Sequence, residues 1–285
     1  MKVLVLGSTG MAGNVISQYL SEQGYEVYRT SRSENLGKYS RPLDVTNFGA
    51  LEAWLDELNP DIVVNCVGLL EKACADRPDL GVLMNAYLPR RLEAKYKNSS
   101  TRIIQLSTDC VFSGARGSYR EDDVTDGASV YDRSKALGEL KNDKDLTFRM
   151  SIIGPDIDPN GIGLFNWFMS QKGAVQGWSK AIWNGVSTVE LARGIDEAIR
   201  QNLSGLYQLV PNETISKFEL LKLFKEKFRR NDIIVEKIDG LDVNKTLLCT
   251  RKDFNFAVKS YPEQIEDMKD WVYSHPSMYP HYFAE

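Results

Sequence analysis

The chain has 285 residues, of which 42% are hydrophobic and 26% are charged, and its formal net charge is −4 at pH 7. This composition is that of an ordinary globular protein, large enough for one sizeable core or two unequal lobes. The slight negative charge gives no reason to expect nucleic acid or an anionic membrane as a partner. The N-terminal apolar run ends at Gly7 and is too short for a signal sequence or a membrane span, so we expect a cytoplasmic protein.

The chain offers few side chains that could bind a metal. Its four cysteines lack the paired spacing of metal ligands, and its two histidines, His275 and His281, both lie near the C-terminus. We therefore expect no zinc or other metal site.

The N-terminus has the order of strand, glycine turn and helix. Residues 2–6 form a short apolar run, Gly7, Gly10 and Gly13 follow at intervals of three, and residues 14–23 have helical periodicity. In such a unit the backbone N–H groups and the helix dipole face a pyrophosphate, and the last glycine lets helix and strand pack closely. The sequence therefore predicts a dinucleotide site here.

The second predicted strand, residues 26–29, leads into Ser31 and Arg32, where an NAD site would usually place an acid for the ribose hydroxyls. Arginine and serine suit a 2′-phosphate instead, so we favour NADP(H) and keep NAD(H) as the alternative. Further on, Asp44 could accept a hydrogen bond from the adenine amino group. Thr46 beside it could equally be the cap of a predicted helix over residues 48–58.

Strands and helices then continue to alternate along the chain. Residues 62–64 are β-branched and end in small residues, a helix-rich stretch covers 79–97, and a strand is predicted over 102–106. This order predicts an α/β fold with a doubly wound parallel sheet of the Rossmann type. We expect residues 1–155 to form the NADP(H)-binding domain. Residues 156–285 would form a smaller lobe that binds mainly substrate, with the segment around 180–210 packing back on the first domain.

A possible pair of reacting side chains lies in a predicted helix over residues 129–141. Tyr131 and Lys135 are four residues apart, so they share one helix face, although a charged surface helix also produces this spacing by accident. Thr108 follows the predicted strand 102–106, so its hydroxyl can face the same crevice. Reduction of a carbonyl needs a proton donor for the oxygen and a group that holds it in line. A tyrosine next to an ammonium group, together with a threonine, meets that need.

Together these motifs resemble the extended short-chain dehydrogenase/reductases and, within them, the dTDP-4-dehydrorhamnose reductase branch. The resemblance covers residues 1 to about 155 and is thin afterwards. It is carried by Gly7-x-x-Gly10-x-x-Gly13, Ser107-Thr-Asp-x-Val-Phe112, Tyr131-Asp-Arg-Ser-Lys-Ala-Leu-Gly-Glu139 and Arg149-Met-Ser.

The resemblance implies an NAD(P)H-dependent reductase of a nucleotide-activated 4-keto-6-deoxy sugar, serving deoxysugar synthesis for a surface polysaccharide. Its catalytic residues would be Thr108, Tyr131 and Lys135. The cofactor would be lined by Gly7, Thr9, Gly10, Met11, Gly13, Ser31, Arg32, Asp44, Val45, Cys66, Val67, Gly68, Ser107, Tyr131 and Lys135. The sugar nucleotide would contact Thr108, Cys110, Val111, Trp178 and Trp183.

This chain also departs from the family at one position beside the expected site. Cys110 stands where the family commonly has a tyrosine, which puts the sugar-binding geometry next to Thr108 in doubt. We expect Cys110 to be a buried, inert thiol rather than a reactive one.

Three other functions are alternatives to the reductase. The related 4,6-dehydratases place two acids directly after the threonine, whereas only Asp109 stands here, so dehydration is disfavoured. A sugar-nucleotide 4-epimerase would use the same three catalytic residues and stays open. A regulatory subunit that binds NADP(H) without chemistry also stays open, although it would not need the intact trio. Relatives often dimerise, so a homodimer is expected as well.

Overall fold

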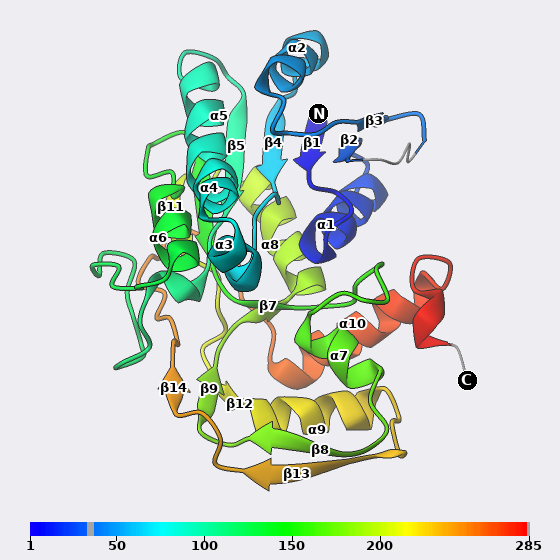
Figure 1. Ribbon diagram of the computed structural model, residues 1–285. Coiled ribbons are helices and arrows are strands. Elements are labelled where there is room, and N and C mark those ends of the chain that lie inside the picture. The colour runs from blue at the N-terminus through cyan, green and yellow to red at the C-terminus, as the bar shows by residue number, and fades with distance from the viewer. Residues whose placement is uncertain (33–36, 284–285) are drawn as a thin grey trace.

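The computed structural model describes residues 1–32 and 37–283 and has a seven-stranded parallel sheet at its centre (Figure 1). The strands run in the order β11-β6-β5-β4-β1-β2-β3. This confirms the predicted doubly wound Rossmann architecture. The sheet consists of β1 (Lys2–Leu6), β2 (Glu26–Ser31), β3 (Ser40–Pro42), β4 (Ile62–Asn65), β5 (Arg102–Leu106), β6 (Leu146–Arg149) and β11 (Gly205–Gln208).

Helices cover both faces of this sheet because its central strands are apolar on both sides. In β1, Val3 and Val5 pack into one core cluster while Leu4 and Leu6 pack into another, as the two-residue period of a strand requires. The first cluster takes residues from α1 (Met11–Glu22) and α8 (Thr188–Arg200). The second takes residues from α2 (Phe48–Leu58) and α5 (Leu88–Tyr96).

The first helix begins at Met11, three residues earlier than the periodicity predicts. Gly10 is its N-cap, and the N–H of Asn14 donates to the carbonyl of Gly10 at 2.9 Å. A Cβ atom added at Gly13 would lie 2.2 Å from the carbonyl oxygen of Gly7, so only glycine lets the helix start this close to the strand. The glycine turn is therefore part of the helix that it introduces.

The helix over residues 48–58 forms as predicted, but its cap is Asn47. The side chain of Asn47 accepts a hydrogen bond from the N–H of Ala50 at 3.1 Å. The hydroxyl of Thr46 instead donates to the carboxylate of Asp44 at 2.8 Å. The alternative in which Thr46 caps this helix is therefore wrong.

The predicted helix-rich stretch over 79–97 is broken into pieces. It contains α4 (Pro78–Val82), a single π-helical turn (Leu83–Tyr87) and α5, and a further short helix, α3 (Glu71–Asp76), precedes it. The widened turn brings Asn85 toward α6, where its side chain contacts Ser134.

The helix that carries Tyr131 is α6 (Val130–Leu137), and it ends four residues before the predicted end at 141. It opens with a capping box in which Ser129 and Asp132 bind each other's backbone N–H groups at 3.1 and 3.0 Å. It stops at Gly138, where an added Cβ would lie 2.0 Å from the carbonyl oxygen of Asn85. Close packing against the π-helical turn thus sets its end.

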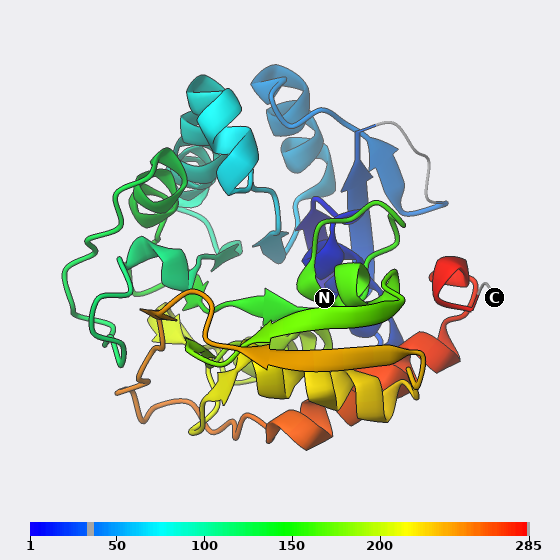
Figure 2. The same ribbon diagram turned by 60° about the horizontal axis from the view of Figure 1, so that its bottom comes forward.

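The rest of the chain forms a second group of elements below the sheet in Figure 1. A three-stranded sheet has the order β12-β9-β14, and Figure 2 shows the paired strands β8 and β13 running alongside α9, against which both pack. The first helix of this second group, α7, is an aromatic segment that includes Phe165 and Trp167. The bounds are β7 (Ile152–Ile153), α7 (Leu164–Met169), β8 (Gly173–Trp178), β9 (Ala181–Trp183), β10 (Val186–Ser187), β12 (Ile215–Ser216), α9 (Lys217–Lys227), β13 (Ile233–Ile238), β14 (Val243–Asn244) and α10 (Tyr261–Ser274).

The chain returns to the large sheet after this second group has begun. Strand β11 pairs in parallel with β6 at the sheet edge, and α8 packs against α1. Across residues 1–32 and 37–283, we find no helix both long and apolar enough to cross a bilayer.

A buried ion pair ties α6 to the sheet. Arg149, at the end of β6, donates to both carboxylate oxygens of Glu139 at 2.9 and 2.8 Å, and neither side chain is exposed. The hydroxyl of Ser107, just after β5, donates to the same carboxylate at 2.8 Å. Since Glu139 stands two residues beyond the end of α6, these bonds fix that helix relative to two strand ends.

We predict that Glu139→Ala strongly destabilises the protein. The substitution would leave the guanidinium of Arg149 buried without a counter-charge, which costs about 3–5 kcal/mol in the free energy of unfolding. Urea unfolding at neutral pH measures this loss. Glu57→Ala is the control, because Glu57 forms a surface ion pair with Arg41 at 2.9 Å and should change stability little. A loss below about 1 kcal/mol for Glu139→Ala would contradict the assigned role.

Candidate active site

The glycine turn meets the end of β4 at the point where the strand order reverses. Strands β2 and β3 lie on one side of β1, and β4, β5 and β6 lie on the other. A Cβ atom added at Gly7 would lie 3.1 Å from Cγ2 of Val67 and 3.3 Å from the carbonyl carbon of Cys66. The predicted cofactor residues that follow β1 and β4 therefore lie side by side. In open parallel sheets, this switch point is where ligands bind.

The glycine turn fits the pyrophosphate of a dinucleotide. The first N–H groups of α1, beginning at Met11, have no acceptor within the helix, and no acidic residue stands in its first turn. A Cβ atom at Gly10 would meet only the carbonyl oxygen of Gly7, at 3.5 Å, so the turn leaves room for close approach. On the other side of the crevice, Nζ of Lys135 lies 3.8 Å from where a Cβ of Gly68 would be.

The residues predicted to hold the adenosine end lie at the end of β2 and just beyond β3. Ser31 and Val45 are buried, whereas Arg32 is exposed. Hydrogen bonds from the backbone and side chain of Thr46 lower the pKa of Asp44, and the charge of Arg32 lowers it further. Arg32 thus lies close enough to Asp44 for their charges to interact, and both stay predicted cofactor residues.

Thr108 and Tyr131 face each other across the end of β5. The hydroxyl of Thr108 accepts from the N–H of Cys110 and lies near Oδ1 of Asp109, both at 3.1 Å. Burial raises the pKa of Tyr131, and a hydrogen bond with Thr108 partly opposes this rise. The phenol therefore stays protonated at neutral pH, as a proton donor must. The structure brings these two predicted residues together.

Lys135 is buried beside them and holds the end of β5. Its Nζ donates to the carbonyl oxygen of Leu106 at 2.6 Å, two residues before Thr108. Burial lowers the pKa of Lys135 to about 8, and the carboxylate of Glu139 is the largest influence in the other direction. The ammonium is therefore positioned one helical turn from the Tyr131 phenol and close to deprotonation under mildly alkaline conditions.

Asn85 lies beside the candidate site, although no local pattern in the sequence singles it out. It is fully buried in the π-helical turn, where its side chain bonds both backbone groups of Leu69 at 2.9 and 3.0 Å. The side-chain nitrogen of Asn85 also donates to the hydroxyl of Ser134 at 3.2 Å, and Ser134 directly precedes Lys135. Asn85 therefore joins the loop after β4 to α6. A π-helical turn often occurs at a functional site, but its position is not visible in local periodicity.

The thiols near the site are neutral at physiological pH. Burial raises the pKa of Cys66 to about 12 and that of Cys110 to about 11. The expectation of an inert Cys110 thiol agrees with this rise, but the residue is half-buried rather than buried. Ser107, predicted to line the cofactor, has its hydroxyl bound to Glu139.

The predicted sugar contacts differ in how much surface they offer. Val111 and Trp183 are buried, whereas Trp178 is exposed at the end of β8. A Cβ atom added at Gly240 would lie 2.5 Å from the Trp178 ring, which shows that this ring packs on the turn after β13. The substrate contacts of all three stay predictions.

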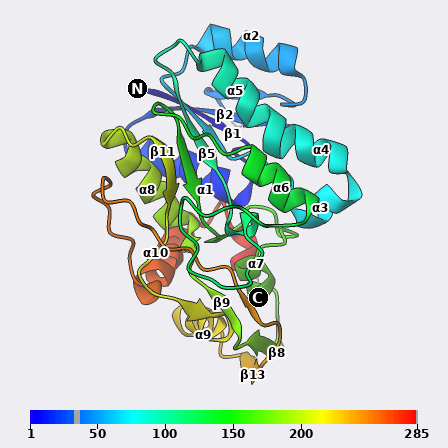
Figure 3. The same ribbon diagram turned by 90° about the vertical axis from the view of Figure 1, so that its left-hand side faces the viewer.

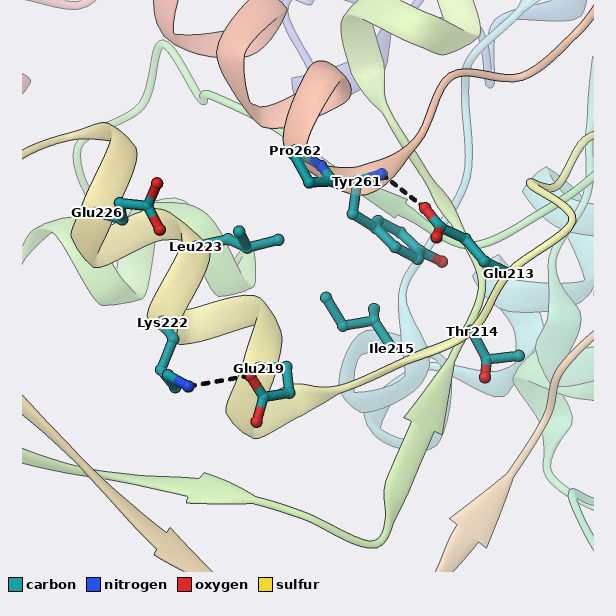
Figure 4. Close-up of a pocket in the computed structure, with 9 residues that line it drawn as sticks. All are labelled: Glu213, Thr214, Ile215, Glu219, Lys222, Leu223, Glu226, Tyr261 and Pro262. Atoms are coloured by element: carbon teal, nitrogen blue, oxygen red, sulfur yellow. Dashed lines mark hydrogen bonds and ion pairs between the residues drawn. The ribbon is translucent and has the colours of Figure 1, made fainter.

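A shallow groove lies elsewhere, on the exposed side of α9 (Figure 4). It has a volume of about 260 Å³, and none of the predicted site residues lines it. Its wall includes Tyr261, whose hydroxyl donates to the carbonyl of Trp183 at 3.4 Å. The groove therefore lies next to the end of β9 and does not include Thr108 or Tyr131.

The chain resembles known proteins over much of its length. Residues 1–246 match the RmlD substrate binding domain family. A dTDP-4-dehydrorhamnose reductase of Streptomyces griseus is 33% identical over 138 residues, which are 48% of this chain and 43% of that protein. Among the reductase relatives, the chain spans about half of their length in the match. The methionine adenosyltransferase 2 subunit beta of Xenopus tropicalis is 21% identical over 241 residues, 80% of this chain and 72% of that protein.

The fold also matches a solved structure. The dTDP-4-dehydrorhamnose reductase of Bacillus anthracis in complex with NADP superposes with a TM-score of 0.80 at 20% identity, covering 95% of this chain and 99% of that one. Because the family match spans residues 1–246, the resemblance drawn from the glycine turn and the Ser-Thr-Asp and Tyr-x-x-x-Lys motifs is confirmed. The chain belongs to the RmlD substrate binding domain family.

Proposed function

We propose that this protein is an NADPH-dependent reductase of a nucleotide-activated 4-keto-6-deoxy sugar. The observation that carries the proposal is the convergence of Thr108, Tyr131 and Lys135 beside the crevice at the switch point. A phenol paired with a threonine and backed by a lysine is the apparatus that carbonyl reduction needs. The names of the reductase relatives support this substrate class.

In this mechanism NADPH, held by the glycine turn with Ser31, Arg32 and Asp44, would supply the hydride. Thr108 holds the substrate carbonyl oxygen in line, and Tyr131 gives that oxygen its proton. The ammonium of Lys135 stabilises the phenolate that remains, because it lies one helical turn away in a site with little water. Lys135 also faces the loop after β4, where it would bind a ribose hydroxyl.

The two parts of the chain would then have separate tasks. Residues 1–155 bind the dinucleotide, and residues 156–285 mainly bind the substrate, with Cys110 and Val111 joining from the first part. All four cysteines are unpaired, which suits a reducing compartment, so we infer a cytoplasmic location. A homodimer is also expected from the family.

The most direct test of the activity is a screen of substrates. NADPH and NADH oxidation would be followed with a panel of dTDP-, UDP- and GDP-linked 4-keto-6-deoxy sugars. Oxidation with one of these sugars supports a reductase. Conversion of a sugar nucleotide with tightly held NAD and no added cofactor would instead indicate a 4-epimerase. NADPH binding without turnover, together with one stoichiometric protein partner, would indicate a regulatory subunit.

We predict that Tyr131→Phe lowers kcat by about 10²- to 10⁴-fold, because the proton donor is lost. Its affinity for NADPH should stay close to that of the wild type, as measured by fluorescence titration. Tyr87→Phe is the control, since Tyr87 lies on the neighbouring π-helical turn and its hydroxyl bonds only to Arg91 among the described contacts. An unchanged turnover in Tyr131→Phe would sink the assignment.

We predict that Arg32→Ala changes cofactor choice. Loss of a charged partner for the 2′-phosphate should lower kcat/KM for NADPH by about 10- to 100-fold and leave the value for NADH near that of the wild type. Arg41→Ala serves as the control, because the guanidinium of Arg41 is engaged by Glu57 at 2.9 Å. Equal losses with both cofactors would argue for the NAD(H) alternative.

We predict a fall in kcat/KM as the pH rises through about 8, the pKa of Lys135. Below that pH the ammonium is charged and stabilises the Tyr131 phenolate, whereas above it this stabilisation is lost. Initial rates of NADPH oxidation across the pH range check this. Lys135→Met should be slow and should lack this limb, while Lys97→Met, which removes an exposed lysine, should keep it. A wild-type profile that stays flat from roughly pH 7 to 10 would contradict the role of Lys135.

A further inference from the structure

Two lysines of the second group of elements converge on the turn that follows Thr108. Lys217 is the first residue of α9, directly after β12, and Lys245 directly follows β14. Strands β12 and β14 both pair with β9, and Ile215 in β12 lies opposite Trp183. Figure 1 shows this small sheet on the same side of the molecule as α6 and below it, and β9 also lies below α6 in Figure 3. Strand pairing in this sheet thus brings together Lys217 and Lys245, which come from segments far apart in the sequence.

Each lysine stem is fixed by packing. The ammonium of Lys217 lies 4.9 Å from the centroid of the Trp183 ring, a cation–π contact with a buried indole. The stem of Lys245 packs against the loop after the turn, since a Cβ atom at Gly114 would lie 2.9 Å from its Cγ. Neither amine is therefore a fully exposed group on a freely moving side chain.

Both amines interact with the same two residues, Asp109 and Cys110. Burial acts to lower the pKa of both amines, whereas the Asp109 carboxylate acts in the opposite direction on each of them, and a hydrogen bond with Cys110 also raises the pKa of Lys245. Within residues 1–32 and 37–283, however, no carboxylate oxygen comes within 4.0 Å of either amine. The amines and Asp109 thus face one another without contact.

None of the other described groups at this place forms an ion pair with the two amines. Burial raises the pKa of both Asp109 and Cys110, so the thiol is uncharged at neutral pH. Asp132 also acts on Lys245, but its carboxylate is engaged by the backbone N–H of Ser129 at 3.0 Å. Partly buried ammonium groups without a contacting counter-charge are costly, and an anionic ligand would satisfy them.

We propose that Lys217 and Lys245 form a binding site for an anionic oxygen group of the substrate, beside Thr108. The proposal rests on the proposed function, since it takes the substrate to lie against Thr108 and Tyr131. The anion cannot be the cofactor pyrophosphate, because the glycine turn follows β1, two strands away from β5. It is either the diphosphate of the sugar nucleotide or a carboxylate on the sugar itself.

The test measures binding without turnover, by calorimetry on the full chain saturated with NADP⁺. The probes are UDP, dTDP, UDP-glucose and UDP-glucuronate, with uridine and thymidine as uncharged references. We expect Lys217→Met and Lys245→Met each to weaken binding of the charged probes by about tenfold or more and to leave nucleoside binding unchanged. Lys217→Arg and Lys245→Arg should restore much of the affinity.

The two sources of the anion give different patterns. If the site takes the diphosphate, UDP and both UDP-sugars lose affinity alike in the variants. If it takes a carboxylate, the wild type prefers UDP-glucuronate to UDP-glucose, and this preference disappears in both methionine variants. Either pattern supports the site.

Lys222→Met is the matched control. Lys222 lies on the same helix α9, with its ammonium 5.3 Å from the Phe218 ring, but it already pairs with Glu219 at 3.2 Å (Figure 4). Removing it should not affect these affinities.

The site is overturned if Lys217→Met and Lys245→Met bind the charged probes as Lys222→Met does, or if the wild type binds none of them. A protein that binds these anions through the two lysines but reduces no keto sugar would refute the reductase and not the site. Unfolding midpoints of all variants exclude misfolding as the cause of weaker binding.

Discussion

The arrangement of the site depends on one buried ion pair, between Glu139 and Arg149. Neither side chain reaches solvent, so each needs the other, and the bidentate geometry allows only one orientation. Ser107 binds the same carboxylate and so brings the end of β5 into the arrangement. Helix α6 is held at its C-terminal end by this cluster and at its N-terminal end by the cap of Ser129. The side chains of Tyr131 and Lys135, which lie between these two fixed ends, therefore have a defined position.

Burial shifts the pKa values of the two candidate reacting groups of α6, Tyr131 and Lys135, in opposite directions. It favours the uncharged form of each, so it raises the pKa of Tyr131 and lowers that of Lys135. The phenol is thereby kept as a donor, while the ammonium is retained mainly because Glu139 lies close by. The ion pair that fixes the helix therefore also adjusts the electrostatics of the site. A single substitution at Glu139 would alter both, which is why stability and activity must be measured separately there.

The sequence predicts best what is encoded by neighbouring residues. The strand over 2–6, the helix over 48–58 and the glycine turn all rest on local periodicity or spacing, and the structure agrees with them. The partners of Glu139 stand 10 and 32 residues away, and no local pattern joins them. The position of Asn85 could not be predicted from local patterns either, because the π-helical turn that orients it packs against α6. Lys217 and Lys245 become neighbours only when both flanking strands pair with β9.

Cys110, Lys217 and Lys245 are best considered together, because both lysines interact with the turn that contains Cys110. The resemblance to the reductase branch would place a tyrosine here, and its side chain is much larger than that of Cys110. A short, uncharged thiol instead leaves room there and lets both ammonium groups act on the turn. In the proposed anion site, the substrate would be recognised here by charge. The three proposed catalytic residues would then be kept while the side chains that select the substrate differ, so the fold and these residues would constrain the reaction more tightly than the sugar.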